Sequence, residues 1–500
     1  TEVIGAHDNR LAHLRDVLMG AKQASYREHK SDDLFYPSAL NDSQLAAVRH
    51  VITAQDVAII HGPPGTGKTT TLVQAILETT RRERRVLVCA PSNTAVDLLT
   101  EKLAERSVNV IRLGNPSRVS ELLLKHTLDA GVMAHPSYSK MHAMRQTAEQ
   151  HRETANEYVR DFGIEARHHR QWLREEARTL RQTADDLERF ITEDVLETVQ
   201  VITCTLVGAS NRNIRQLSFE TVFIDEAAQA LEPGCWIAIA RAQRVVLAGD
   251  HHQLPPTVKS EKAAQEGLRE TLFEKCIQRQ PNTARMLNVQ YRMHEHIMAF
   301  SSDRFYGNQL TAHASVCHAG LAAYDPCFEN DLPVEFLDTA GCGFLEVAMP
   351  ETRSTANPDE ANLLISRLEQ LLAPYAHGER HNKPLTVGVI APYRAQINYL
   401  RDCIEDNAAL NDLILQRHLS VGTVDSFQGQ ERDIIAISLT RSNPFGEIGF
   451  LSDIRRMNVG MTRARRKLLM VGDASTLCSN PFFSDLLAYV KRTGGYRLNA

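Results

Sequence analysis

Short apolar runs alternate with longer amphipathic stretches through most of the chain. In the first half, four runs predict strands: VAII at 57–60, VLVCA at 86–90, TVFIDEA at 221–227 and RVVLAGD at 244–250. Strands that are apolar along their whole length and separated by helices are typical of a parallel sheet covered on both faces. This half is therefore predicted to form an α/β domain.

A second series of the same kind follows. Its runs are LTVGVIAPY at 385–393, LSVGTVDSF at 419–427, DIIAISLT at 433–440 and KLLMVGD at 467–473. We place the boundary near residue 285, which gives one α/β domain over 40–285 and another over 286–500. A chain of 500 residues is long enough to bury more than one large core.

Two helical segments accompany these domains. Residues 118–198 are charged, and seam positions recur there at alternating spacings of three and four. They are Met144, Ala148, His151, Ala155, Tyr158 and Phe162 before Gly163, and Leu173, Ala177, Leu180, Ala184, Leu187 and Ile191 after it. Two such stripes predict an antiparallel helical hairpin inserted in the first domain, with arms about 30 Å long. The stripes need only pack on each other, and a protein partner for the hairpin stays open.

The N-terminal segment, residues 1–39, is predicted to contain a further amphipathic helix. Leu11, Leu14 and Leu18 fall on one face of a helix over residues 8–24. That apolar face needs a partner surface.

Composition limits the function classes. The 61 acidic residues outnumber the 56 basic ones, so the net charge of −5 provides no overall attraction for a polyanion, and any nucleic-acid contact must be local. No apolar run approaches the roughly 18 residues of a membrane span, and the first ten residues lack the pattern of a secretory signal. Nine scattered cysteines without metal-ligand spacing predict reduced thiols in a cytoplasmic protein, with a single disulfide and a nuclear pool left open. The histidine pairs 168–169, 251–252 and 294–296 lack a third ligand at metal spacing, so no metal site is predicted there.

The sequence GPPGTGKT at 62–69 fits the phosphate-binding P-loop, and it lies between a predicted strand and a predicted helix, as that pattern requires. Backbone amides of the loop and the helix N-terminus favour bound phosphate. Lys68 would reach the β and γ phosphates, and the hydroxyl of Thr69 would bind Mg²⁺. The nucleotide-contacting residues are then Gly62, Pro63, Pro64, Gly65, Thr66, Gly67, Lys68, Thr69 and Thr70.

Two adjacent carboxylates, Asp225 and Glu226, end the predicted strand TVFI. Asp225 stands where P-loop ATPases place a metal-binding Asp, and Glu226 could polarise the attacking water. An acidic pair after a strand is also common on solvated surfaces. A P-loop alone leaves kinases, GTPases, transporters and remodelling ATPases open.

Further motifs in fixed order decide between these classes. They are LNDSQLAAV (40–48), APSNTAVD (90–97), TCTLVGAS (203–210), DEAAQALEP (225–233), GDHHQLPPT (249–257), QYRMH (290–294), APYRAQ (391–396), VGTVDSFQGQE (421–431) and NVGMTRARR (458–466). With them the chain resembles superfamily 1 helicases of the 5′ to 3′ branch, in the group of the nonsense-mediated-decay RNA helicase. The stretches LTAHASV (310–316), DTAGCG (338–343) and RSNPFGEIGFLSDIRRMNV (441–459) most resemble the immunoglobulin-mu-binding-protein helicase of that group.

The resemblance implies an α/β fold with two tandem RecA-like P-loop domains, ATP and Mg²⁺ as cofactors, and single-stranded RNA or DNA as partner. It implies that Gln44 reads the adenine edge and that Tyr291 stacks on the base. Arg292 and Arg463 would be arginine fingers of the second domain, a role that suits a planar guanidinium that stays charged. Ordinary salt bridges remain an alternative for both arginines.

The remaining implied sites join the nucleotide to the strand. Gln253 resembles the sensor between phosphate and nucleic acid, and Glu431 resembles the carboxylate near the ribose, although surface exposure alone would also explain Glu431. The residues implied to contact the strand are Pro91, Ser92, Asn93, Thr203, Thr205, Pro392, Tyr393, Thr423 and Ser426. Their hydroxyls, amides and loop N–H groups suit phosphate and sugar contacts that carry no base information. Tyr393 could stack on a base or pack as a core or hinge residue.

We therefore expect a monomeric ATP-dependent helicase or translocase that moves 5′ to 3′ on single-stranded RNA or DNA. A translocase that strips proteins without unwinding would carry the same motifs, whereas Lys68, Glu226 and both arginines disfavour an ATP-gated clamp or scaffold. Members of the group resemble one another in a small β-barrel before the Gln motif, and the 39 residues here are too few for it. The helix at 8–24 is then read as the remnant of a stalk, and protein partners are expected through the hairpin or through terminal segments absent from this sequence.

Overall fold

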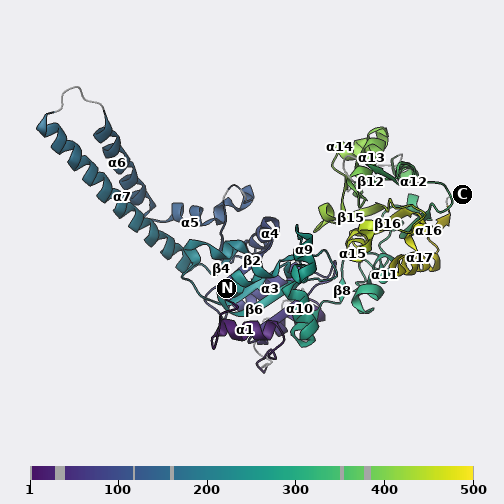
Figure 1. Ribbon diagram of the computed structural model, residues 1–500, viewed down its shortest axis with the longest axis horizontal. Coiled ribbons are helices and arrows are strands. Elements are labelled where there is room, and N and C mark those ends of the chain that lie inside the picture. Colours follow the sequence, from purple (N-terminus) through teal and green to yellow (C-terminus); the bar gives the residue numbers. More distant parts are fainter. Residues whose placement is uncertain are drawn as a thin grey trace.

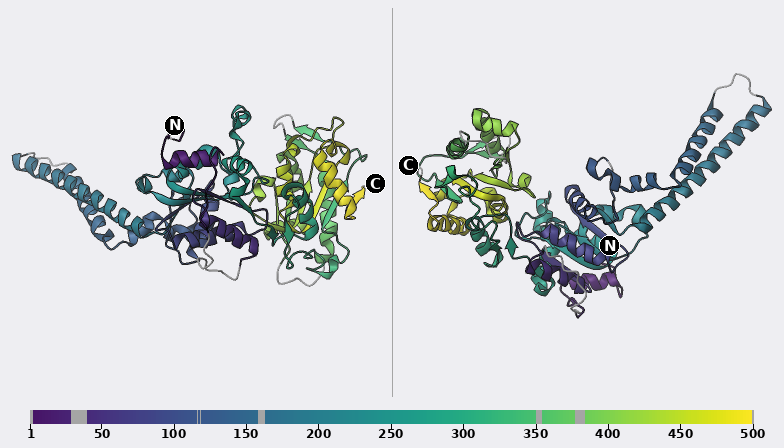
Figure 2. Two further views of the ribbon diagram at one scale, coloured as in Figure 1. Left: turned by 90° about the horizontal axis from the view of Figure 1, so that it is seen from below. Right: turned by 180° about the vertical axis from the view of Figure 1, so that it is seen from behind.

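The computed structural model describes residues 3–28, 40–115, 117, 119–157, 163–349, 354–376 and 384–498. It has two lobes, each built on a parallel sheet (Figure 1). A long helical hairpin projects from the first lobe, on the side away from the second lobe (Figures 1 and 2). Within the described ranges, no helix is both long enough and apolar enough to cross a membrane.

The first lobe contains a seven-stranded sheet in the order β3-β4-β2-β5-β6-β1-β7, with every pair parallel. Its strands are β1 (Val57–His61), β2 (Val86–Ala90), β3 (Val110–Arg112), β4 (Val201–Thr205), β5 (Phe219–Ile224), β6 (Ala242–Gly249) and β7 (Ala284–Met286). Successive side chains of a strand point to opposite faces. Ile59 and Ile60 of β1 accordingly enter two different apolar cores.

Helices cover both faces of this sheet. One core contains residues of α2 (Asp42–Thr53), α3 (Lys68–Thr80) and α4 (Asn93–Ala104). The other contains residues of α1 (Arg10–Leu18), α8 (Glu232–Ile239) and α10 (Leu272–Arg279). Burial on both faces explains why the strands are apolar throughout.

The second lobe repeats this plan with a six-stranded parallel sheet in the order β14-β13-β15-β16-β10-β17. Its strands are β10 (Val334–Asp338), β13 (Val387–Ile390), β14 (Leu419–Gly422), β15 (Arg432–Ser438), β16 (Ala464–Gly472) and β17 (Tyr496–Leu498). The main helices are α11 (Glu295–Tyr306), α12 (Pro358–Ala376), α13 (Arg394–Glu405), α14 (Ala408–Leu415), α15 (Ile454–Met461) and α17 (Pro481–Arg492). The expected pair of tandem α/β domains is therefore confirmed.

Two expectations for the first lobe differ from the structure in their residue bounds. The N-terminal helix covers only Arg10–Leu18 rather than residues 8–24. Its Leu14 and Leu18 are fully buried in the core beneath the sheet, which supplies the partner that its apolar face needs. The predicted boundary at residue 285 falls inside β7, so the last strand of the first sheet ends slightly beyond it.

The hairpin lies between β3 and β4 in the chain. It consists of α6 (Tyr138–Asn156) and α7 (Ile164–Thr198), preceded by the short α5 (Leu128–Ala134). The seam buries Ala148 and Ala155 of α6 against Leu173 and Ala184 of α7. Two predicted seam residues, Tyr158 and Phe162, lie outside the described residues.

Candidate nucleotide site between the lobes

The P-loop connects β1 to α3 and contains two left-handed glycines. Gly65 has φ +76° and Gly67 has φ +75°, a region that side chains other than glycine rarely adopt. A Cβ atom at Gly65 would lie 2.7 Å from Cβ of Arg292, and one at Gly67 would lie 2.7 Å from Nε2 of Gln44. The loop thus needs glycine for its turn and for the close approach of two predicted site residues.

Lys68 lies between the two predicted carboxylates. Its Nζ is 3.0 Å from Oδ1 of Asp225 and 2.6 Å from Oε1 of Glu226. Burial by itself would lower the pKa of Lys68, but the two carboxylates outweigh it and hold the pKa above its usual value. The ammonium therefore stays charged, as a phosphate-binding group must. The surface alternative does not hold for Asp225, which is only 4% exposed, and Glu226 is half-buried beside Lys68.

Glu226 has two features suited to a water-activating group. Its backbone is in the left-handed region at φ 51°, a conformation that costs a residue other than glycine of the order of 1–3 kcal/mol. Burial raises the pKa of its carboxyl above the usual value. Its Oε2 accepts a hydrogen bond from Nε2 of Gln229 at 2.9 Å, which fixes the direction of the carboxylate.

The donors expected for Mg²⁺ are oxygens on two neighbouring elements. Asp225 directly follows β5, and its Oδ1 accepts the backbone N–H of Glu226 at 2.8 Å. Thr69 is half-buried in the first turn of α3. A carboxylate and a hydroxyl at the edge of a phosphate site are the hard oxygen ligands that Mg²⁺ takes, so these residues fit the ion.

The predicted adenine contacts, Gln44 and Tyr291, are joined through Asn41. Gln44 is buried; its Nε2 donates to the carbonyl of Thr66 at 3.0 Å and its Oε1 accepts the N–H of Asn41 at 3.0 Å. Nδ2 of Asn41 donates to the hydroxyl of Tyr291 at 3.0 Å. The Tyr291 ring is 40% exposed and lies 4.6 Å from the ring of His313. These contacts bring Gln44 and Tyr291 to the same end of the P-loop.

Both predicted arginine fingers lie at the cleft. Nε of Arg292 is 2.7 Å from Oε2 of Glu431, and the backbone N–H of the preceding Tyr291 donates to the carbonyl of Gly65 at 2.8 Å. Arg463 is almost fully buried, and its guanidinium donates to Oε1 of Gln253 in the first lobe at 3.2 Å. Burial, and then the charge of Arg292, lower the pKa of Arg463 to about 9. Two cations held together in this way favour an anion between them.

Asp250 follows β6 and collects hydrogen bonds from both lobes. Its Oδ1 lies 3.1 Å from Nε2 of His61, and its Oδ2 accepts from Nε2 of Gln253 at 2.8 Å. The hydroxyl of Tyr306, in the second lobe, donates to Oδ2 at 2.8 Å. Burial opposes the charge of Asp250, but His61 and Gln253 outweigh it and hold its pKa well below the usual range. Asp250 thereby connects the strand before the P-loop with Gln253 and the second lobe.

His251 joins this cluster, contrary to the expectation that its pair lacks further ligands. One ligand atom each of His61, Asp250 and His251 lie within 4.8 Å of one another. The sequence could not indicate this, because His61 is 189 residues from Asp250. The Asp250 carboxylate is already used by four donors of the protein, including the backbone N–H of His252.

Most residues predicted to contact the strand follow the carboxyl ends of neighbouring strands. On the first lobe, Pro91 and Ser92 follow β2, and Thr205 ends β4, which neighbours β2. On the second lobe, Pro392 follows β13 and Thr423 follows β14, and these two strands are neighbours. Ser426 is exposed one helical turn after Thr423. They form two groups, one on each lobe. Ser92 already caps α4 through a bond from the N–H of Ala95.

Two predictions of strand contact change with the structure, those for Thr203 and Tyr393. Thr203 is fully buried and its hydroxyl bonds that of Thr100 at 2.7 Å, because it points into the core beside α4 rather than to the strand end. Tyr393 is 6% exposed; its hydroxyl accepts from Arg441 at 3.1 Å, so the core alternative holds. Oδ1 of Asn93 accepts from the buried Arg112 at 2.8 Å, which leaves its amide nitrogen available.

Comparison with known proteins gives the family. Two models, each described as an AAA domain, match residues 39–261 and 268–475. An uncharacterised ATP-dependent helicase of Methanocaldococcus jannaschii is 31% identical over 497 residues, covering 91% of this chain and 71% of that protein. The chain belongs to the superfamily 1 helicases of the nonsense-mediated-decay helicase group.

Other relatives of this helicase chain are eukaryotic. DNA-binding protein SMUBP-2 of Mesocricetus auratus is 36% identical over 499 residues, covering 98% of this chain. DNA polymerase alpha-associated DNA helicase A of Saccharomyces cerevisiae is 35% identical over 476 residues, covering 89% of this chain and 66% of that protein. The chain spans about half, 48%, of the length of SMUBP-2. The solved PRRSV helicase has 14% identity and a TM-score of 0.37 over 87% of this chain, a likeness too low to add to the assignment.

The sequence did not single out several residues at the site of this helicase. Asn41 and His313 support Tyr291, and Tyr306 reaches Asp250 from the second lobe. Asp250 lies inside the motif GDHHQLPPT, Asn41 inside LNDSQLAAV and His313 inside LTAHASV, so only Tyr306 falls outside the motifs. An acidic or amide side chain at the end of a strand was the available signal for Asp250, because such positions carry ligands in open α/β sheets.

Proposed function

We propose that this chain hydrolyses ATP between its two lobes and uses the cycle to move 5′ to 3′ along single-stranded RNA or DNA, unwinding duplexes that it meets. The whole activity is our inference from the family and from the geometry of this chain. A monomer contains every residue that the mechanism uses.

One observation carries the proposal: the second lobe contacts the nucleotide site of the first. The backbone N–H of Tyr291 donates to the P-loop carbonyl of Gly65, and the guanidinium of Arg463 donates to Oε1 of Gln253. Hydrolysis that needs groups from both lobes is coupled to their closure, because an incomplete site cannot stabilise the charge of the transition state.

Each charged side chain has a defined task in this scheme. Lys68 exchanges its carboxylate partners for the β and γ phosphates of ATP, and Asp225 and Thr69 would hold the Mg²⁺ that neutralises their charge. Glu226, released from Lys68, accepts a proton from the attacking water. Arg292 and Arg463 donate to the γ-phosphate as charge develops on it. Glu431, the present counter-ion of Arg292, is freed to bond the ribose.

The nucleic-acid path follows the strand ends of both lobes. Ser92 and Thr205 on the first lobe, with Thr423 and Ser426 on the second, offer hydroxyls to phosphate and sugar. Pro91 and Pro392 stand in the same two groups but have no N–H to donate. Two groups on separate lobes change their separation when the cleft closes. Movement along a strand needs such a change in the distance between the two strand-binding groups.

A second candidate function uses the same cycle to displace proteins from a strand without unwinding. The site residues are the same for both tasks, and a cytoplasmic location suits either.

Steady-state ATPase assays with matched RNA and DNA oligomers test the proposal. We expect stimulation by single strands, with Arg463→Lys reducing turnover strongly because a point charge cannot replace a planar fork. Arg417→Lys, at an exposed turn, serves as the matched control. Duplexes with 5′ or 3′ tails report direction, and a protein bound to the strand reports displacement. Absence of stimulation by either nucleic acid would contradict the proposal.

A further inference from the structure

Five arginines form a row along one face of α7 in the projecting hairpin. They are Arg167, Arg170, Arg174, Arg178 and Arg181. Their spacings of three, four, four and three residues return once per helical turn, so the side chains share one face. At 1.5 Å per residue the row is about 21 Å long. We call these residues the arginine row.

Two of the three acidic residues of the same stretch lie on another face. Glu165 and Glu176 fall nearly opposite the arginine row by helical periodicity. The third, Glu175, stands three residues before Arg178, and its Oε1 accepts from Nε2 of Gln171 at 3.2 Å. Within the part of the chain that the structure describes, Arg174, Arg178 and Arg181 form no ion pair; Arg174 reaches Oδ1 of Asn156 at 3.5 Å.

The helix gains no stability from this arrangement. Arg170 and Arg174, and Arg174 and Arg178, are like charges four residues apart, which disfavour a helix by a few tenths of a kcal/mol per pair. Near the base of the hairpin the pattern differs, because Arg145 pairs with Asp185 at 3.0 Å and with Glu188 at 2.6 Å. The three arginines of the row that form no ion pair among the described residues, Arg174, Arg178 and Arg181, thus lie farther from the base of the hairpin than these pairs.

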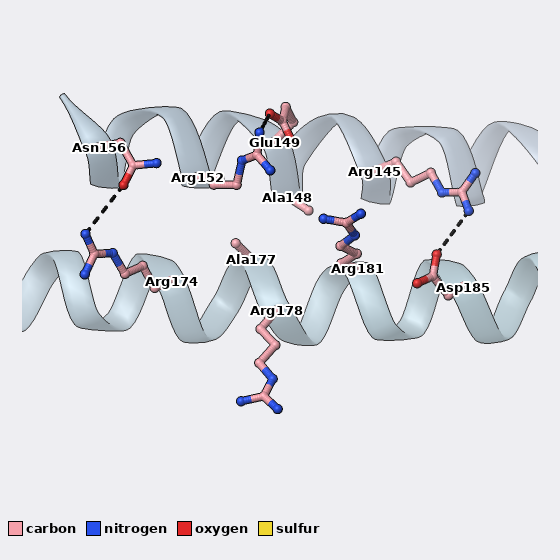
Figure 3. Close-up of a pocket in the computed structure, with 10 residues that line it drawn as sticks. All are labelled: Arg145, Ala148, Glu149, Arg152, Asn156, Arg174, Ala177, Arg178, Arg181 and Asp185. Carbon is pink, nitrogen blue, oxygen red and sulfur yellow. Dashed lines mark hydrogen bonds and ion pairs between the residues drawn. The ribbon is translucent and has the colours of Figure 1, made fainter.

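A groove adjoins the arginine row where the seam is narrow. Ala148 of α6 and Ala177 of α7 face each other there, and their small side chains leave a space of about 710 Å³ between the helices (Figure 3). The guanidinium of Arg181 extends into the gap beside Ala148, whereas Arg178 points away from α6 (Figure 3). Five arginines and only two carboxylates line this groove.

We propose that the arginine row and its groove bind the phosphate backbone of nucleic acid outside the path between the lobes. The inference rests on the proposed function, which makes nucleic acid the substrate of this chain. A regular series of guanidinium forks suits a polymer with one phosphate per residue, since each fork can bond two phosphate oxygens. A chain of net charge −5 needs such local basic surfaces to hold a polyanion.

The position of the hairpin defines what the contact does. It projects away from the second lobe, so the arginine row is remote from the cleft that opens and closes (Figures 1 and 2). A backbone held there stays attached while the strand contacts of the two lobes change. The segment bound is either the duplex or a neighbouring stretch of single strand.

Binding of labelled oligonucleotides to two variants of the full chain tests the proposal. Arg178→Gln with Arg181→Gln removes two charges of the row, neither of which has a partner among the described residues. Lys140→Gln with Arg189→Gln removes two charges elsewhere on the same hairpin and is the matched control. Thermal unfolding of each variant checks that it is folded.

Affinity is measured over a range of salt concentrations with a single strand, a blunt duplex and a tailed duplex as probes. We expect the row variant to bind roughly tenfold more weakly at physiological salt and its salt slope to fall by about 1.4 to 1.8, the value for two lost phosphate contacts. The control variant should bind like the wild type. The probe that loses affinity identifies duplex or single strand as the segment held.

The outcomes separate this inference from the proposed function. If the wild type binds none of the probes, the proposed function fails. If the wild type binds and the row variant binds all three equally well at every salt concentration, the present inference is wrong and the row belongs to an acidic protein partner or to solvent. Equal losses in the row and control variants would also overturn it, because the effect would then be one of overall charge.

Discussion

The hydroxyl of Tyr306 in α11 of the second lobe donates a hydrogen bond to Oδ2 of Asp250 in the first lobe, at 2.8 Å. The same hydroxyl accepts from Nδ2 of Asn458 at 3.1 Å. Oδ2 of Asp250 also accepts from Nε2 of Gln253, which turns Oε1 of Gln253 toward Arg463. Burial raises the pKa of Tyr306, so its hydroxyl keeps the proton that it donates. One phenol thus connects the second lobe to the Gln253 amide that bonds Arg463.

Tyr306→Phe is expected to lower the kcat of nucleic-acid-stimulated ATP hydrolysis about tenfold, with a smaller change in KM for ATP. The substitution keeps the ring and removes one hydrogen bond to a charged group, a contribution of about 1.5–3 kcal/mol. Tyr489→Phe is the matched control, since its hydroxyl donates to the carbonyl of His296 at 2.6 Å, within the second lobe. Equal kcat values for the two variants would show that the Tyr306 bond plays no part in turnover.

Lys68→Ala should reduce ATP turnover at least about 100-fold, the order of effect of removing a preorganised charge from a transition state. It would also leave Asp225 and Glu226 adjacent without the ammonium that lies between them. Lys102→Ala is a suitable control, because Lys102 is half-buried in α4 and its Nζ is 2.9 Å from Oε2 of the exposed Glu105. Substantial ATPase activity in the Lys68 variant would rule out the proposed phosphate site.

Glu360 gives a prediction for the pH dependence of stability. It is fully buried in α12, where Oε1 accepts from the hydroxyl of Ser438 at 2.6 Å and the N–H of Thr440 at 2.7 Å. Burial raises its pKa from 4.5 to about 7. A carboxyl with a raised folded-state pKa contributes its stability below pH 4.5 and loses it as the pH rises through about 7.

Glu360→Gln removes that titration while keeping an acceptor oxygen. The free energy of unfolding of the variant relative to the wild type should therefore increase by roughly 3 kcal/mol between pH 5 and pH 8. Urea unfolding of both proteins at the two pH values measures the difference. A constant difference across this range would mean that Glu360 does not titrate there.

The sequence predicted the parts of this molecule that local patterns determine. Fully apolar strands such as VLVCA (86–90) coincide with β2, and the P-loop motif already carries the turn that Gly65 and Gly67 make. The short strands β3 and β7 were not predicted, because three residues are too few to show a periodic pattern. The helix predicted over residues 8–24 was too long. The helix ends at Leu18, and an apolar stripe does not indicate at which residue a helix ends.

The candidate site was predictable where a motif carries the chemistry and unpredictable where a contact joins distant segments. Asp225 and Glu226, which the motifs single out, lie beside Lys68. Thr203 was wrong because alternate residues of a strand face opposite sides, and a motif does not state which side meets a helix such as α4. The Tyr306 bond to Asp250 spans 56 residues and two lobes, so no local pattern indicates it.

Lys467 provides a test of what stabilises the second lobe. It is fully buried in β16, with Nζ 2.5 Å from Oδ1 of Asp331 and 2.7 Å from Oε2 of Glu335 on the neighbouring β10. Lys467→Met keeps most of the side-chain volume but leaves Asp331 without a cation, and Glu335 with Arg367 alone. Removing one partner of a buried ion pair costs about 3–5 kcal/mol, so chemical denaturation should show a loss of that size. Adding Asp331→Asn and Glu335→Gln to Lys467→Met should restore part of it, because uncharged amides no longer need the ammonium. A combined variant no more stable than Lys467→Met alone would mean that packing around the lysine stem, rather than the buried charges, is responsible.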